Sequence, residues 1–196
     1  MNVTAILNTL LHGNQLKRTA RTGWVQRGVA NAENVAAHSY GVVFTSLVLA
    51  QLIDEPIDLG KALAIATLHD LAEGLTTDIP RPAWSYLPSG IKIDVERAAM
   101  ADILAGVPFA AVLVDYWEEL HSNETAEARL VHDADRLDLF LQALVYEQQT
   151  GNRRLEEFWT VRHQFHFAPA QAVYDELLAR RAQSHNDDTT ANAPHQ

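Results

Sequence analysis

The stretch that most constrains the fold is residues 31–53, NAENVAAHSYGVVFTSLVLAQLI, which is long and apolar on most of its sides. A helix of this kind has no polar face to leave in water, so other helices must surround it. Flanking segments also repeat their apolar residues at helical spacing, and no long stretch alternates as a β-strand would. The sequence therefore predicts an all-α globular bundle with residues 31–53 near its centre.

The ends of the other helices are predicted from residues that favour helix termini. Helices are expected over residues 3–18, 31–53, 59–74, 90–106, 109–121, 124–149, 153–165 and 168–183. Asp58, Ser89 and Asn123 are expected to cap three of them at the N-terminus, and Gly151 is expected to close the longest late one. Three prolines within residues 75–90 predict a loop.

Length and composition indicate one domain. The chain has 196 residues, 47% of them hydrophobic, which is enough for a single core. We expect the domain to span residues 1–183, and the polar residues 184–196 to form a disordered tail. No basic region precedes an apolar stretch at the N-terminus, and the most apolar segment is too short to span a bilayer. A soluble, cytoplasmic protein is therefore expected, with no membrane partner.

Charge and cysteine content limit the chemistry. The formal net charge of −10 argues against a surface for nucleic-acid polymers, although a local cationic site for a small anion remains possible. There is no cysteine, so any metal site must be built from His, Asp and Glu.

An unusual group of ionisable residues follows an apolar helical run in GKALAIATLHDLAEG. At helical spacing, His69, Asp70 and Glu73 form one cluster. The cluster lies on the same side of the helix as Ile65, and that side is expected to face the core. Burying three ionisable groups costs on the order of several kcal/mol unless they are paired or bind a cation. A divalent metal ion would resolve this cost.

Two residues from other core-type helices complete a ligand set. His38 lies inside the central apolar helix, and Asp135 lies in LVHDADRLDLF between apolar neighbours. Together with His69 and Asp70 they offer two imidazoles and two carboxylates, which suits Mn²⁺, Fe²⁺, Co²⁺, Zn²⁺ or Ni²⁺ better than Ca²⁺. Taken singly, each has a structural interpretation, as a hydrogen-bonded core histidine or as an acid on a solvated face. As a set they predict one divalent transition metal with open coordination positions.

A family resemblance rests on four motifs in order. These are LKRTARTGWVQRGVANAENVAAHS, LHDLAEGLTTDIPRP, DVERAAM and YWEELHSNETAEARLVHDADRLDLFLQA. Over residues 16–145 the chain resembles the HD-domain metal-dependent phosphohydrolases, and among them the bacterial and eukaryotic 5′-deoxynucleotidases. The resemblance implies an HD-domain helical bundle and metal binding by the four residues named above. It further implies catalytic roles for Glu73 and Asp78, and a place for Trp24 beside the sugar.

The chain departs from this family at positions that touch substrate. Bacterial members place Arg directly before the Trp, where this chain has Gly23. Relatives often have Gly before the loop Asp and Lys before the last metal Asp, where this chain has Thr77 and His132. The expected substrate-binding residues are Arg21, Trp24, Arg27 and Lys92.

The resemblance implies hydrolysis of deoxynucleoside 5′-monophosphates to nucleoside and phosphate. Alternatives are a deoxynucleoside triphosphate triphosphohydrolase on the same fold and a non-catalytic nucleotide-binding protein. A di-iron oxygenase is a further alternative, and it would need His121 or His132 to bind a second metal. A homodimer or higher homo-oligomer is also expected, because Phe158, Trp159, Phe165 and Phe167 exceed what one small domain needs on its late helices.

Overall fold

The computed structural model describes residues 1–84 and 86–191, and helices make up the fold in this part of the chain. Its single β-contact there is an isolated antiparallel bridge between Ala20 and Asn34. In chain order the elements are α1 (Val3–Gln15), η1 (Leu16–Arg18), α2 (Thr22–Gln26), α3 (Val35–Leu49), α4 (Leu59–Leu68), α5 (Glu73–Thr76), α6 (Arg81–Trp84), α7 (Ile91–Ile103), α8 (Ala110–Ser122), α9 (Ala126–Thr150), η2 (Arg153–Trp159) and α10 (Ala168–Ala191). The predicted all-α class is confirmed.

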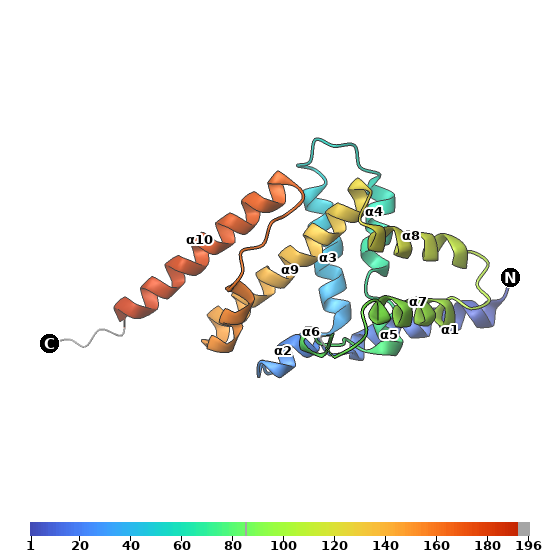
Figure 1. Cartoon of the computed structure of the whole chain (residues 1–196), viewed down its shortest axis with the longest axis horizontal. Coiled ribbons are helices and arrows are strands. Elements are labelled where there is room, and N and C mark those ends of the chain that lie inside the picture. The colour runs from blue at the N-terminus through green and yellow to red at the C-terminus, as the bar shows by residue number, and fades with distance from the viewer. Residues whose placement is uncertain (85, 192–196) are drawn as a thin grey trace.

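Helix α3 lies at the centre, where α9 crosses it and α4 packs beside it (Figure 1). Val42 and Leu49 of α3 meet Ile65 of α4 and Leu137 of α9 in one fully buried cluster. Tyr174 of α10 joins the same cluster, so α10 covers the outer side of α9. The prediction that residues 31–53 are central is correct for the side of α3 that carries Val42 and Leu49, whereas Tyr40, Phe44 and Val48 on its other side stay exposed.

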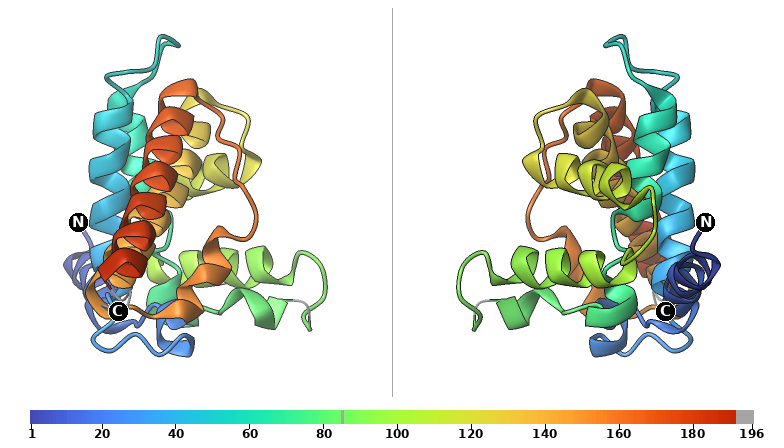
Figure 2. Two further views of the ribbon diagram at one scale, coloured as in Figure 1. Left: turned by 90° about the vertical axis from the view of Figure 1, so that its left-hand side faces the viewer. Right: turned by 90° about the vertical axis from the view of Figure 1, so that its right-hand side faces the viewer.

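Two smaller clusters attach the rest of the chain. Met100 of α7 and Trp117 of α8 pack with Leu16 in a second cluster. In the views of Figure 2, α7 lies near the lower end of the central helices. Trp24 packs with Tyr146 of α9 and Leu155 of η2. This last cluster fixes the segment between η1 and α3 against the C-terminal half of α9.

Several helix ends agree with the sequence. The Asp58 side chain accepts a hydrogen bond from the Lys61 backbone N–H at 3.0 Å, so Asp58 caps α4 as predicted. Gly151 ends α9 with a φ of 62°, a conformation that suits glycine.

Four local predictions were wrong. The helix expected over residues 153–165 is a 3-10 helix that ends at Trp159. Asn123 ends α8 in a left-handed conformation, and Thr125 caps α9 by accepting from the Ala128 N–H at 3.2 Å. Gly90 rather than Ser89 precedes α7. The proline-rich loop contains the short helix α6, because a proline at the second helical position needs no intrahelical donor.

The predicted helix 59–74 is interrupted. Helix α4 ends at Leu68, and the chain continues through tight turns in which each N–H bonds three residues back: Leu71 to Leu68, Glu73 to Asp70, and Gly74 to Leu71. These bonds tighten the backbone relative to an α-helix. As a result His69, Asp70 and Glu73 do not lie on one regular helical face, although they still face one region of the molecule.

The late aromatic residues pack inside the chain. Phe158 contacts Trp24 at a ring separation of 4.8 Å, Trp159 contacts Phe140 at 5.1 Å, and Phe165 lies 5.3 Å from Tyr174. Phe167 is buried in the central cluster. These rings fill the domain's own core, so the reason given for expecting an oligomer was wrong.

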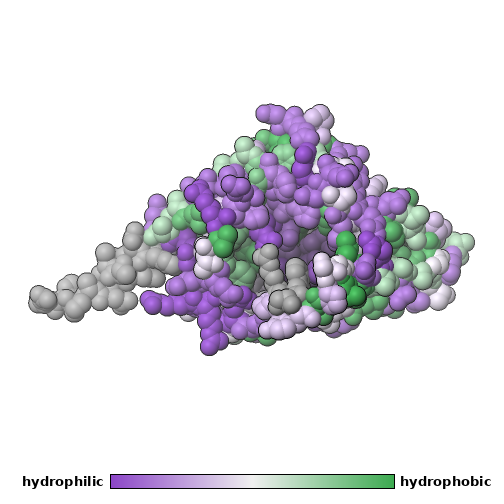
Figure 3. All heavy atoms as spheres, in the orientation of Figure 1, coloured by the Kyte–Doolittle hydropathy of each residue, from purple (hydrophilic) through white to green (hydrophobic). Residues whose placement is uncertain are grey.

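The C-terminal helix continues into the predicted tail. Helix α10 extends to Ala191 and so overlaps the predicted tail over residues 184–191, while residues 192–196 lie outside the described part of the chain. Within residues 1–84 and 86–191, no helix is both long enough and apolar enough to cross a membrane. The face in Figure 3 is largely hydrophilic, with separate hydrophobic patches.

Candidate metal centre and substrate cavity

Three predicted ligands meet where α3, the end of α4 and α9 come together. The Nε2 atom of His38 lies 3.3 Å from Nε2 of His69 and 3.1 Å from Oδ1 of Asp135. The ligand atoms of these three residues all lie within 4.8 Å of one another. Asp70 lies at the edge of this group, with its Oδ2 at 3.2 Å from His69 Nε2 and 3.7 Å from His38 Nε2.

The other ring nitrogens are fixed by hydrogen bonds. Nδ1 of His69 donates to the Ala66 carbonyl oxygen at 2.7 Å, and Nδ1 of His38 donates to Oδ2 of Asp138 at 2.7 Å. In the neutral imidazoles, protons on Nδ1 leave both Nε2 lone pairs directed at the same point. Two such nitrogens and an adjacent carboxylate are the donor set that a divalent transition metal ion requires.

Asp138 reaches His38 because residue 41 is glycine. Gly41 lies one turn after His38 on α3, and a Cβ added there would overlap the carboxyl group of Asp138. Glycine inside a helix costs about 1 kcal/mol relative to alanine. Here the missing side chain lets the α9 carboxylate lie against α3 and orient the His38 ring.

We expect Gly41→Ala to weaken metal binding by about 10- to 100-fold, the usual effect of disturbing a partner of a metal-ligating histidine. Helix propensity alone would predict the opposite, a stabilised α3 with unchanged binding. Calorimetric titration with Mn²⁺ or Co²⁺ measures the change. Gly60→Ala is the matched control, because the nearest atom to its added Cβ is Asp58 Oδ1 at 3.4 Å. Equal affinity in both variants would contradict the role given to Gly41.

Positive charge is favoured between the clustered carboxylates. Burial and the nearby Arg21 lower the pKa of His38, but hydrogen bonds to Asp135 and Asp138 outweigh them and raise it to about 10. Burial disfavours charge on Asp70, yet His69, Arg21 and His38 outweigh burial and hold the pKa of Asp70 below its ordinary value. A divalent cation would take the place of the His38 proton, since metal ligation needs a deprotonated Nε2.

Glu73 is buried beside this cluster without a full set of partners. Its side chain is 4% exposed, and its Oε2 atom has no hydrogen-bond partner among the described residues. Burial, together with the charges of Asp70 and Asp78, raises the pKa of Glu73 to about 9. A buried carboxyl group with an unsatisfied oxygen is costly to keep unless a ligand uses it.

Asp78 is held in place by the segment before α3. Its Oδ2 accepts a hydrogen bond from the Thr22 N–H at 2.8 Å, and its carbonyl accepts one from the Thr22 hydroxyl at 2.7 Å. The preceding residue, Thr77, has φ 62° and ψ 165°, a region adopted almost only by glycine. This strained turn explains why glycine suits that position, and it directs Asp78 towards Thr22.

Asp70, Glu73 and Asp78 line a cavity of about 250 Å³, which we call the catalytic cavity. The predicted site residues that line it are Arg21, Trp24, Asp70, Glu73, Asp78, Lys92 and Asp135. Arg21 lies 3.5 Å from Asp70, and Lys92 lies 2.8 Å from Glu96. The cavity therefore combines cations suited to a phosphate with the carboxylates of the metal cluster.

Arg27 lies outside this lining. Its guanidinium donates to the Gly23 carbonyl at 2.9 Å and pairs with Glu157 at 3.0 Å, above the ring of Phe158. Direct contact between Arg27 and a phosphate in the catalytic cavity would require breaking these bonds.

Trp24, which the family resemblance places beside the sugar, lines the catalytic cavity. It is 1% exposed and donates from Nε1 to Glu33 at 2.9 Å. Its ring meets the edge of Tyr146, whose hydroxyl accepts from the Glu33 N–H at 2.8 Å. These contacts fix the indole ring in one orientation at the cavity.

The supporting residues Asp138 and Glu33 are absent from the predicted set. Glu33, His38 and Asp138 bring their ligand atoms within 4.8 Å of one another, behind the first cluster. The spacing of Asp135 and Asp138, three residues apart on one helix, is the only sequence signal that pointed to this second carboxylate.

His121 and His132 are both engaged elsewhere. His121 Nδ1 donates to the Trp117 carbonyl at 2.8 Å, and His132 Nε2 bonds to the Leu120 carbonyl at 2.9 Å. Neither belongs to a group of potential metal ligands within the described residues. The oxygenase alternative needs further ligands beside His121 or His132, and the described residues bring no such group together there.

Comparisons with known proteins show which family this chain belongs to. A family model described as HD domain matches residues 13–173, a range that contains all four predicted metal ligands. The human protein named 5′-deoxynucleotidase HDDC2 is 32% identical over 185 residues, covering 92% of this chain and 87% of the human one. 5′-deoxynucleotidase YGK1 of Saccharomyces cerevisiae is 28% identical over 158 residues, covering 73% of this chain and 67% of the yeast one. The crystal structure of PH0347 protein from Pyrococcus horikoshii is 34% identical with a TM-score of 0.75, covering 88% of this chain and 96% of that one.

Proposed function

This chain belongs to the HD domain family, and on that premise we propose that it hydrolyses deoxynucleoside 5′-monophosphates to deoxynucleosides and inorganic phosphate. The observation that carries the proposal is the convergence of the His38 and His69 Nε2 atoms, 3.3 Å apart, on the Asp135 carboxylate beside a cavity that also contains Arg21 and Lys92. A metal cluster next to phosphate-binding cations is the arrangement that phosphate-ester hydrolysis needs.

The metal is held by His38, His69, Asp70 and Asp135 in this proposal. A divalent ion supplies positive charge that polarises a phosphoryl oxygen and acidifies water. The donor set accepts Co²⁺, Mn²⁺, Zn²⁺, Fe²⁺ or Ni²⁺. Asp70 would be the fourth ligand, since its Oδ2 lies 3.2 Å from His69 Nε2.

The side chains around the cavity divide the remaining work. Water attacks phosphorus, the bond from phosphorus to the 5′ oxygen breaks, and that oxygen leaves with a proton. Glu73 holds a proton near the cluster and delivers it to the leaving oxygen, whereas Asp78, fixed by Thr22, orients the water. Arg21 and Lys92 neutralise charge on the phosphoryl oxygens.

Trp24 supports selectivity for deoxyribose. Its ring is held by Glu33 and Tyr146, so the indole cannot move aside without losing those contacts. A ribose 2′-hydroxyl placed against this apolar surface would lose its hydrogen bonds to water.

The proposal is tested by measuring phosphate release from a panel of deoxynucleoside and ribonucleoside 5′-monophosphates, with and without Co²⁺ or Mn²⁺. Release of inorganic phosphate that depends on added metal is the expected result. Triphosphate released from deoxynucleoside triphosphates would favour the triphosphohydrolase alternative. Binding without turnover would favour the non-catalytic alternative.

We also propose a homodimer or higher closed oligomer acting in the cytoplasm. The support lies on α3, where Tyr40, Phe44 and Val48 form an apolar stripe, with Tyr40 72% and Phe44 54% exposed. Exposed apolar faces of this kind are commonly buried between subunits. Light scattering at micromolar concentration should give at least twice the mass of one chain. A monomer under these conditions would refute the proposal.

A further inference from the structure

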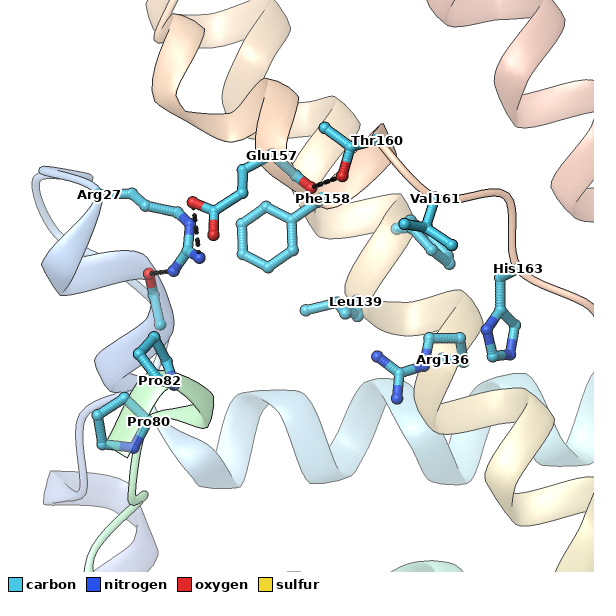
Figure 4. Close-up of a pocket in the computed structure, with 12 residues that line it drawn as sticks. Arg27, Pro80, Pro82, Arg136, Leu139, Glu157, Phe158, Thr160, Val161 and His163 are labelled. Carbon is cyan, nitrogen blue, oxygen red and sulfur yellow. Dashed lines mark hydrogen bonds and ion pairs between the residues drawn. The ribbon is translucent and has the colours of Figure 1, made fainter. Parts of the chain in front are cut away.

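A second cavity of about 540 Å³ lies beside the catalytic one (Figure 4). Its wall is mainly apolar, formed by Pro80, Pro82, Leu139, Phe158 and Val161. The ion pair between Arg27 and Glu157, 3.0 Å in length, lies along one side of it. The reaction assigned to the metal cluster does not use this space.

The two cavities share part of their wall. Gly23, Pro80, Arg136, Leu139 and Phe158 line both of them. The catalytic cavity, at about 250 Å³, is smaller than the roughly 300–1,000 Å³ of ordinary ligand pockets. A nucleotide with its phosphate at the metal cluster therefore has to extend into the neighbouring space.

Arg136 stands at the junction. It directly follows the metal ligand Asp135 on α9, and its side chain reaches into the second cavity below Leu139 (Figure 4). Within the described part of the chain, Arg136 makes no hydrogen bond or ion pair. By contrast, Arg27 is already bonded to Gly23 and Glu157. The five donors of Arg136 are therefore available to acceptors on a ligand in this cavity.

We propose that the second cavity holds the nucleobase of the substrate and that Arg136 donates hydrogen bonds to acceptor atoms on the edge of that base. Apolar walls accommodate the faces of a base, and a few placed polar groups read its edge, as in other small-molecule pockets. The phosphate lies elsewhere, because Arg21 and Lys92 line only the catalytic cavity of the two. This inference rests on the proposed function, since only a substrate with a base has a group to place here.

The test compares substrates with and without a base. Initial rates with dGMP, dTMP and 2-deoxyribose 5-phosphate give kcat/KM for each, and the readout is the ratio of the nucleotide value to the base-free value. Arg136→Met keeps the length of the side chain but removes its donors. The ratio should fall by about 10- to 100-fold, mainly through KM, as expected for loss of a charged hydrogen bond.

A second variant and a control keep the result interpretable. Val161→Trp changes a residue that is 76% exposed, so it should fold, and the larger side chain should lower the same ratio by occupying the cavity. Arg180→Met removes an exposed arginine of α10 that pairs with Glu176, and its ratio should equal that of the wild type. An unchanged ratio in Arg136→Met, or an equal loss with base-free phosphate, would overturn the assignment. If the wild type hydrolyses only 2-deoxyribose 5-phosphate, the proposed function fails instead.

Discussion

Replacing His69 by alanine should remove both the bound metal and the phosphatase activity. His69 supplies one of two Nε2 atoms that converge 3.3 Å apart, and its ring is already oriented by the Ala66 carbonyl. Losing an outer partner of a metal ligand costs about 10- to 100-fold in affinity or activity, and losing the ligand itself should cost more. Metal content per chain by plasma mass spectrometry, with phosphate release from dGMP, measures both effects.

The matched control is His12→Ala, because His12 is partly exposed on α1 and outside the cluster. This variant should keep its metal and its turnover. Asp135→Ala should weaken metal retention as well, since it leaves two imidazoles with only Asp70 beside them. A His69→Ala protein that remains active and keeps its metal would contradict the assignment of His69 as a ligand.

Replacing Glu73 by glutamine should lower kcat by about 10²- to 10⁴-fold while leaving the metal content close to normal. Glutamine has nearly the same shape, but it cannot deliver a proton to the leaving oxygen. Glu73 is not among the three residues whose ligand atoms converge, so the ion keeps its ligands. Steady-state kinetics at saturating Mn²⁺, with metal analysis of the same sample, separates the two effects.

Glu127→Gln provides the comparison, because Glu127 is also a buried glutamate but bonds to Asp58 and Lys61 away from the cavity. Its kcat should stay at the wild-type value, whatever happens to stability. Suppose instead that Glu73→Gln loses its metal and regains normal turnover when metal is added back. Glu73 would then support the metal ligands rather than transfer a proton.

The central part of the candidate site could be predicted from sequence because burial of ionisable groups leaves a local signal. His38 and Asp135 lie among apolar residues on helices that the periodicity identifies. The free-energy cost of burying these ionisable groups had to be offset by a partner or a bound cation. The structure brings their ligand atoms together with that of His69. The pattern therefore pointed to the helices that carry this cluster, and the family resemblance selected Asp135 among the neighbouring acids.

The supporting contacts could not be predicted in the same way. Beyond its spacing from Asp135, nothing in the sequence singled out Asp138, yet it bonds to His38 through the space that Gly41 leaves. Asp133, two residues before Asp135, is 1% exposed and accepts from the backbone N–H groups of His166 and Phe167. Such roles depend on which helix faces which, and one helix's periodicity does not encode its partner.

The break after Leu68 was hidden for a related reason. Residues 69–73 contain no glycine or proline, and their leucine, alanine and glutamate favour a continuous helix. Tertiary contacts prevailed over this weak preference, and Asp70 and Glu73 turned towards the cavity. Propensity is a small energy compared with the packing of a buried cluster.

The bond between His38 and Asp138 spans 100 residues of chain. Closing so long a loop costs conformational entropy, and contacts of this sequence separation slow folding. A chain emerging from the ribosome carries both histidines well before α9 supplies Asp135 and Asp138. Until that helix docks, the two imidazoles lack the carboxylates that complete the proposed metal site. The proposed site is therefore complete only once the topology is.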